Sequence, residues 1–277
     1  MQFHYAISQG HLNIWETCQR KYQYKYLEEL SLPEADPHRQ ASLLLGSNFH
    51  LLMQQMDLGL DVSVLAQSDR QLQKWLKAFN ESPPTMIEGD RLCEHRRTWE
   101  ISCPAKLDQD IDLDFKDGGD RHQAYFVLTA IYDLLILGKE QAQILDWKTH
   151  QKAIPQSQLE HNWQTRLYLY LLAKTTDFEP EQLSMTYWFA NGADSVVINY
   201  RAADYDRTDR DIKKMLTAIA QAKDYPQVDI SSHKCEYCEF RDRCDRPHQQ
   251  NLEPVDDINL NIFASINNII EIPEVAL

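Results

Sequence analysis

The stretch that decides the fold is residues 133–148, which read Asp-Leu-Leu-Ile-Leu-Gly-Lys-Glu-Gln-Ala-Gln-Ile-Leu-Asp-Trp-Lys. An apolar run over 125–137 stops at the polar segment 138–141 and resumes over 142–147. Two such runs around a short segment with glycine are typical of antiparallel strands joined by a turn. The sequence therefore predicts that Asp133 and Asp146 lie on neighbouring strands.

The residues around Asp146 indicate the chemistry of this hairpin. Because strand side chains alternate between the two faces, Asp146 and Lys148 share one face and Trp147 packs on the other. Carboxylate oxygens hold hard divalent cations, which lower the pKa of a water, and a lysine neutralises or orients the nucleophile. The pattern predicts a site for metal-assisted attack on a phosphate.

The Asp-x-Lys spelling is weak evidence by itself, because surface charges produce it by chance. Of its three occurrences, only the second follows another aspartate across a hairpin. The three are at Asp114 and Lys116, Asp146 and Lys148, and Asp211 and Lys213.

Length and composition limit the class of protein. The chain has 277 residues, of which 43% are hydrophobic, enough for a buried core. No apolar run approaches the roughly 20 residues that span a bilayer, and no export signal is recognisable, so we expect a cytoplasmic protein without membrane contact. A net charge of -14 argues against a protein that coats nucleic acid and limits contacts with DNA to local ones.

The spacing of apolar residues and breakers predicts helices and strands in alternation. We expect one large α/β domain over 1–250, followed by an acidic, isoleucine-rich tail at 251–277 that closes over the sheet or binds a protein partner. The expected helices cover 8–29, 41–58, 64–79, 157–174 and 208–223, and the further strands cover 95–102, 110–116, 185–189 and 196–200.

Two expected helices carry polar pairs at four-residue spacing, which places both members on one face. Gly46 and His50 form the first pair, and His50 is either structural or a metal ligand. Gln164 and Tyr168 form the second pair, which either contacts a substrate or packs in the core.

Six cysteines without an export signal indicate metal ligands or buried thiols rather than disulfides. Three are clustered in the pattern Cys235-x2-Cys238-x5-Cys244, and Cys18, Cys93 and Cys103 are scattered. The cluster resembles the C-x2-C knuckles that hold zinc or iron-sulfur centres.

The order of these features is more specific than any one of them, and it resembles the PD-(D/E)XK nuclease superfamily. The likeness is greatest to its RecB/AddB-type branch, which includes the CRISPR-adaptation exonucleases, and it covers about 7–246. The features in order are Cys18-Gln-Arg-Lys-Tyr, Gly46-x3-His50, Asp133, Asp146-Trp-Lys148, Gln164-x3-Tyr168 and the C-terminal cysteines.

The resemblance implies a central mixed β-sheet flanked by helices, a restriction-endonuclease-like core, with an iron-sulfur knuckle. His50, Asp133 and Asp146 would bind Mg2+ or Mn2+, and Lys148 would assist the nucleophile. Gln164 and Tyr168 would support the site or the substrate. A [4Fe-4S] cluster would be held by Cys18, Cys235, Cys238 and Cys244, or zinc would take these sulfurs, or three of them with His233 or His248.

The implied function is that of a divalent-metal-dependent DNA nuclease, an exonuclease acting on single strands or DNA ends in repair, recombination or CRISPR adaptation. Two alternatives remain open at this point. One is a catalytically inert nuclease-fold scaffold of a larger assembly, and the other is an iron-sulfur or zinc binding module. One departure from the family is the stretch 129–132 before Asp133, Thr-Ala-Ile-Tyr, where a glycine is usual.

Overall fold

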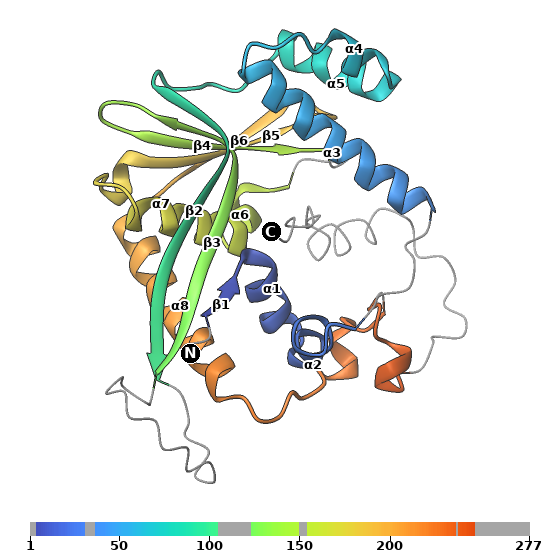
Figure 1. The fold of residues 1–277 in the computed structure, drawn as a ribbon, viewed down its shortest axis with the longest axis vertical. Coiled ribbons are helices and arrows are strands. Elements are labelled where there is room, and N and C mark those ends of the chain that lie inside the picture. The colour runs from blue at the N-terminus through green and yellow to red at the C-terminus, as the bar shows by residue number, and fades with distance from the viewer. Residues whose placement is uncertain (1–3, 31–36, 105–122, 150–153, 237, 247–277) are drawn as a thin grey trace.

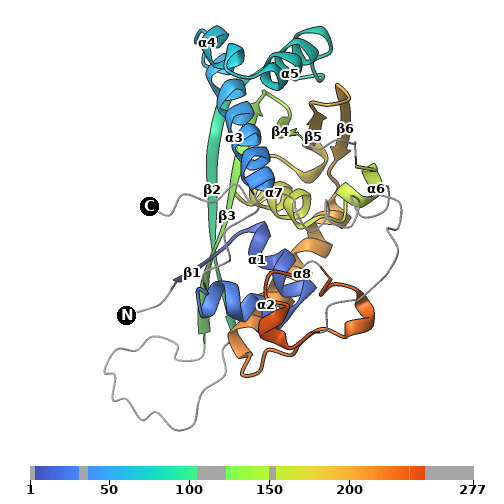
Figure 2. The ribbon, with the colours of Figure 1, turned by 90° about the vertical axis from the view of Figure 1, so that its right-hand side faces the viewer.

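The computed structural model describes residues 4–30, 37–104, 123–149, 154–236 and 238–246, except the side chain of residue 39. A mixed six-stranded sheet forms the centre of the molecule, and helices cover both of its faces (Figures 1 and 2). The path β1-β3-β4-β5-β6 runs across the sheet, and β2 pairs with β3. The strands are β1 His4–Ile7, β2 Asp90–Pro104, β3 Gln123–Leu137, β4 Ala142–Lys148, β5 Leu183–Phe189 and β6 Asp194–Asn199.

Parallel and antiparallel pairs both occur, which confirms the expected mixed α/β sheet. β1 with β3 and β4 with β5 are parallel, and the remaining pairs are antiparallel. The main helices are α1 Gln9–Thr17, α2 Gln19–Tyr22, α3 Pro37–Asp57, α4 Ser63–Gln67, α5 Arg70–Glu81, α6 Gln156–Leu159, α7 Trp163–Lys174 and α8 Ala202–Gln221.

Alternating side chains of the central strands enter two separate cores, one on each face of the sheet. Ile144 and Tyr187 pack with α7 and α8 in the first core. Their neighbours Leu145 and Trp188 pack with α3 and α5 in the second. The apolar runs of β4 and β5 are explained by this arrangement, because strands buried on both faces lack polar alternation.

The central hairpin is confirmed, and its register is set at the turn. Leu137 pairs with Ala142, and the Gly138 N–H donates to the Gln141 carbonyl at 2.9 Å. A Cβ on Gly138 would approach two carbonyl oxygens at 2.9 Å, so this tight turn requires glycine. β3 runs without interruption through 129–132, the stretch that departs from the family pattern.

Three helices expected from the sequence, at 8–29, 64–79 and 157–174, are each divided into shorter helices in the structure. Cys18 takes an extended backbone conformation, with φ -162° and ψ 114°, and separates α1 from α2. Asp69 and Asn162 begin α5 and α7 by accepting N–H bonds from the residues two positions on. Aspartate and asparagine are both favoured N-cap residues. The spacing of apolar residues gave no sign of these two helix starts, whereas the polar N-cap residues do indicate them.

Some expectations fall on residues outside the described part of the chain, namely the strand at 110–116 and the tail at 251–277. Within the described residues, every helix is too short or too polar to cross a lipid bilayer.

Candidate metal centre

The site is built at a fork between β3 and β4. The last backbone pair joins Leu134 to Leu145, the sequence neighbours of Asp133 and Asp146, so the strands separate at the two aspartates. The carboxylate of Asp133 accepts the Trp147 N–H at 2.7 Å and so replaces the next backbone acceptor. This bond satisfies the freed donor and holds the Asp133 carboxylate in the fork beside β4, the strand that carries Asp146.

His50 reaches this fork from α3, on the side of the second core. Its Nδ1 lies 3.2 Å from the Asp133 carboxylate. One turn earlier on α3, Gly46 faces Thr149, and a Cβ there would lie 3.4 Å from the threonine Oγ1. The helix therefore crosses the end of β4 at close range, which directs His50 towards the aspartate.

A buried triangle of polar side chains joins β4 to α7. The Lys148 ammonium lies 2.6 Å from the Asp146 carboxylate and donates to Gln164 Oε1 at 2.9 Å. Gln164 Nε2 donates to the other oxygen of Asp146 at 2.6 Å. The ring of Tyr168 packs edge-on against Tyr132, 5.3 Å between centroids, and its carbonyl accepts the Tyr132 hydroxyl. The expected pair on α7 is thus buried against the site.

Glu94 joins the site from β2, and sequence reasoning missed it. Its carboxylate, the Asp133 carboxylate and a His50 ring nitrogen lie within 4.8 Å of one another. The neighbours of Glu94 pair in register with the neighbours of Asp133, while Glu94 itself has φ +46°. A lone glutamate in a charged edge strand looks like a solvent-facing residue, so only the register across β2 and β3 could have identified it.

The charges of the first ligand pair stabilise each other. Burial alone would raise the pKa of Asp133, but the adjacent His50 and the Trp147 N–H outweigh it and lower that pKa. Burial would lower the pKa of His50, and the Asp133 carboxylate reverses this and raises it. Asp133 is therefore an anion at neutral pH.

The other two carboxylates hold protons more tightly. Burial, with repulsion from Asp133, raises the pKa of Asp146 to about 6, although Lys148 opposes the shift. Burial and the Asp133 charge also raise the pKa of Glu94 to about 7. A concentration of carboxylates that repel one another is the arrangement that a divalent cation relieves.

The structure brings the expected site residues to one end of the sheet but divides them. His50 and Asp133 share a group with Glu94, whereas the carboxylate of Asp146 lies outside that group and is held by Lys148 and Gln164. Their catalytic and ligand roles stay predictions.

The other Asp-x-Lys copies differ from this site. Asp211 and Lys213 lie on α8, where Asp211 pairs with Arg166 at 2.5 Å and Lys213 pairs with Asp209 at 2.7 Å. The copy at 114–116 lies outside the described residues. The α8 copy thus has the ordinary surface role expected of a chance match.

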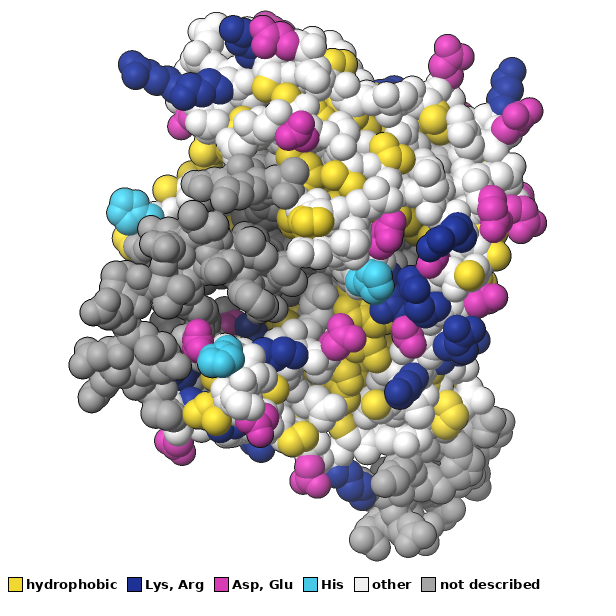
Figure 3. All heavy atoms as spheres, turned by 180° about the vertical axis from the view of Figure 1, so that it is seen from behind, with side chains coloured by type: hydrophobic (Ala, Val, Ile, Leu, Met, Phe, Trp, Pro, Cys, Tyr) yellow, Lys and Arg dark blue, Asp and Glu magenta, His cyan; other side chains and the backbone are white. Residues whose placement is uncertain are grey.

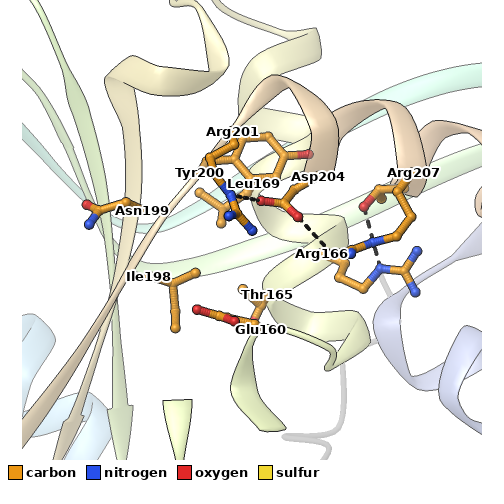
Figure 4. A pocket seen from close by; sticks show the side chains of 11 residues that line it. Glu160, Thr165, Arg166, Leu169, Ile198, Asn199, Tyr200, Arg201, Asp204 and Arg207 are labelled. Atoms are coloured by element: carbon orange, nitrogen blue, oxygen red, sulfur yellow. Dashed lines mark hydrogen bonds and ion pairs between the residues drawn. The ribbon is translucent and has the colours of Figure 1, made fainter. Parts of the chain in front are cut away.

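A separate hollow behind α7 illustrates how arginines are used elsewhere in the fold (Figure 4). Its volume is about 20 Å³, and Arg201 and Arg207 both pair with Asp204 in its wall.

On the face of the molecule drawn in Figure 3, basic and acidic side chains alternate without a large patch of one sign. The face therefore offers little attraction for a phosphate backbone.

The two ends of the described chain meet at the cysteines. Cys18 lies at the break between α1 and α2, and the other three lie at 235–244 in the C-terminal segment. The segments lie side by side in Figures 1 and 2, joined by the ion pair of Lys21 with Glu239 at 2.7 Å. Burial raises the pKa of Cys244, and Cys18 and Cys235 add to the effect by their proximity.

All six cysteines are free thiols, and two have other surroundings. Cys93 donates to Asp57 at 3.0 Å, and Cys103 is buried in the first core. Within the described part of the chain, the clustered sulfurs do not form a group of three ligand atoms within 4.8 Å. A tetrahedral zinc ion, with Zn–S of about 2.3 Å, would bring its sulfurs to about 3.8 Å from one another.

A mixed sheet with a histidine, two carboxylates and an Asp-x-Lys at one strand fork is the architecture of a restriction-endonuclease-like α/β protein. Comparison with protein families agrees, because the model of the PD-(D/E)XK nuclease superfamily matches residues 6–245. The chain belongs to this superfamily. Membership supports a nuclease-type function with nucleic-acid binding and divalent metal, for which the His50, Glu94 and Asp133 group is a candidate site.

Two further comparisons are with curated protein sequences and with solved structures. No curated protein sequence matches the chain. Among solved structures, the chain is similar to the crystal structure of SSO0001, with 13% sequence identity and a TM-score of 0.39. The similarity covers 91% of this chain and 90% of that one.

Proposed function

We propose that this protein is a divalent-metal-dependent DNA nuclease, an exonuclease that acts on single strands or DNA ends. The observation that carries the proposal is the convergence of His50, Asp133, Asp146 and Lys148 at one strand fork. The neighbouring Glu94 adds a third carboxylate, which fits the preference of Mg2+ and Mn2+ for oxygen ligands.

The residues divide the chemistry between them. His50, Glu94 and Asp133 would hold the cation, and Asp146 would join them as a ligand from β4. A bound cation supplies charge for the phosphate and lowers the pKa of an attacking water. Lys148, fixed by an ion pair with Asp146 and a hydrogen bond to Gln164, would direct a proton towards that water and the phosphate oxygens. Gln164 would position both Asp146 and Lys148.

The finer assignment rests on the order of motifs in the sequence. The cysteine pattern favours the RecB/AddB-type branch and a likeness to CRISPR-adaptation exonucleases, with a role in DNA repair, recombination or adaptation. Cys18, Cys235, Cys238 and Cys244 would hold a [4Fe-4S] cluster. Zinc is the alternative occupant of the same sulfurs.

The test is digestion of end-labelled single- and double-stranded DNA with Mg2+, with Mn2+ and with EDTA. We expect wild-type protein to shorten labelled strands only with metal, and Asp146→Ala to leave them intact. Wild-type protein that binds DNA without cleaving it would instead establish an inert nuclease-fold scaffold. Anaerobic purification with iron and sulfide analysis tests the cluster separately.

We expect the affinity for Mn2+ to rise steeply between about pH 5 and pH 7. Below their raised pKa values of about 6 and about 7, Asp146 and Glu94 carry protons that a cation must displace, and His50, whose pKa is also raised, must lose its proton to become a ligand. Release of one proton changes the apparent affinity by up to about tenfold per pH unit. Calorimetric titrations at three pH values measure this, and Glu94→Gln should flatten the upper part of the curve. An affinity independent of pH would exclude both carboxylates as ligands.

DNA binding should depend only moderately on salt. A chain with a net charge of -14 offers few local contacts to phosphate. For three to four single-strand phosphates, log K should fall with log salt at a slope of about -2 to -3. Fluorescence anisotropy with a labelled oligonucleotide gives the slope, and a value steeper than about -6 would contradict this expectation and point to a basic groove.

A further inference from the structure

A cavity of about 260 Å³ lies between α3 and the sheet, directly beside the metal centre. Asp133 belongs both to its wall and to the metal group, so the two spaces adjoin. Most of the wall is apolar and rich in sulfur and aromatic rings. These residues are Met53, Met56, Phe79, Met86, Leu134 and Trp147.

We propose that this cavity receives the nucleobase of the nucleotide whose phosphate lies at the metal centre. The inference rests on the proposed nuclease function and specifies its substrate as an unpaired nucleotide. An apolar cavity of about 150 Å³ is enough to bind benzene, so 260 Å³ accommodates a purine or a pyrimidine ring.

The wall suits an aromatic guest. The rings of Phe79 and Trp147 lie 5.6 Å apart at 89°, so they present a face and an edge to a neighbouring ring. Methionine side chains are flexible and make favourable contacts with aromatic rings. Enzymes that take a base into a pocket hold it by stacking between such side chains.

The charges in the wall argue against a phosphate as the occupant. Asp57 and Asp133 both contribute carboxylates to the cavity, and its cation, Arg91, is already paired with Asp57. An anion would meet two like charges, whereas an uncharged base would find a carboxylate and a guanidinium for its polar edge. Arg91 Nε donates to Asp57 at 2.6 Å, and Cys93 donates to the second oxygen of Asp57.

A base in this cavity cannot also be paired with a second strand. The enzyme would therefore act on single strands or on ends that have opened, and unpairing would add to the barrier for duplex ends. The sequence alone left open whether the substrate is single- or double-stranded. A base pocket between α3 and the sheet would explain a preference for single strands.

The experiment compares single-stranded 12-mers that carry a normal base or an abasic residue at one terminal nucleotide, at each end in turn. Binding is measured by anisotropy with Ca2+. At one end, loss of the base should weaken binding to wild-type protein by about 10- to 100-fold, the usual contribution of one stacked base. A 2-aminopurine at that terminus should lose fluorescence on binding.

A cavity-filling variant tests the location. Cys93→Phe fills the cavity from β2, and Ser102→Phe places the same side chain on an exposed position of the same strand. Cys93→Phe should bind base-bearing and abasic oligonucleotides equally, at the weak abasic level, while Ser102→Phe should discriminate as wild type does. The comparison of oligonucleotides on wild-type protein stands even when a variant fails to fold.

Equal binding of base-bearing and abasic oligonucleotides by wild-type protein would overturn the base pocket, as would an equal loss for both in Cys93→Phe. Metal-dependent cleavage without base discrimination would leave the nuclease proposal standing and remove the pocket. Base discrimination without any cleavage would leave the base pocket standing and remove the nuclease proposal.

Discussion

Lys148→Ala should slow cleavage about 100- to 1000-fold while leaving Mn2+ and DNA binding largely in place. The ammonium is held by Asp146 and Gln164 at 2.6 and 2.9 Å, and only 9% of the side chain is exposed. A donor fixed in this way stabilises charge that develops on the phosphate, and loss of one such donor costs roughly 3 to 4 kcal/mol of transition-state stabilisation. Lysine contributes no lone pair to a cation while protonated, so metal affinity should persist.

Asp146→Ala should behave differently, because we propose that this carboxylate binds the cation. We expect it to abolish cleavage and to weaken Mn2+ binding together, which separates its role from that of Lys148 on the same strand face. The matched control is Lys213→Ala, which changes an Asp-x-Lys of the same spelling on α8. Lys213 is 57% exposed and pairs with Asp209, so its loss should change the rate by no more than a few-fold.

Calorimetric titration with Mn2+ and single-turnover digestion, both at pH 8, measure the four proteins. The pH matters because removal of the Lys148 charge leaves burial and Asp133 to raise the pKa of Asp146 further. A measurement at pH 8 rather than at neutral pH reduces the contribution of this protonation to the change in rate. Equal activity of Lys148→Ala and wild type would remove the nuclease assignment from this site.

The parts of the site that sequence predicts well are those fixed by local rules. Alternation along a strand places Asp146 and Lys148 on one face, and a glycine turn sets the register that brings Asp133 opposite β4. A four-residue helical spacing likewise predicts that Gln164 and Tyr168 face one way, and both are buried against the site. Each inference uses fewer than twenty neighbouring positions.

The parts that sequence leaves out depend on distant contacts. Glu94 enters the site because β2 pairs with β3 in one register and because Glu94 itself takes a left-handed backbone conformation. Nothing in its neighbours distinguishes it from Glu100, and both glutamates are exposed on the same strand. The cavity beside Asp133 likewise combines α3, α5 and three strands, and its contents follow from packing between elements rather than from any motif.

Cys18→Ser should remove most of the iron and sulfide and destabilise the protein, as serine at Cys235, Cys238 or Cys244 should. Each cysteine would supply a quarter of one coordination sphere, and metal-binding free energy is shared with folding. Loss of a metal centre belongs to the changes that cost about 4 kcal/mol or more. For a chain of this size, that lowers the melting temperature by roughly 10 °C.

The position of Cys18 makes this substitution the most informative of the four. It lies more than two hundred residues before the other three, at the extended break between α1 and α2. The ion pair of Lys21 with Glu239 and the ring contact of Tyr24 with Phe240 would still hold the two segments together. Those contacts should keep the fold while the cluster is lost, so iron content is the primary measurement.

Cys93→Ser is the matched control, because Cys93 is also a partly exposed free thiol but lies by Asp57, outside the cluster. Serine there can still donate to the carboxylate, so iron, sulfide and melting temperature should all stay near the wild-type values. Cys103→Ser should also retain its iron, although a hydroxyl in the first core lowers stability. Full iron and sulfide in Cys18→Ser would mean that the C-terminal cysteines hold their metal without the N-terminal helix, and that the two segments are joined by contacts such as those of Lys21, Tyr24 and Arg243.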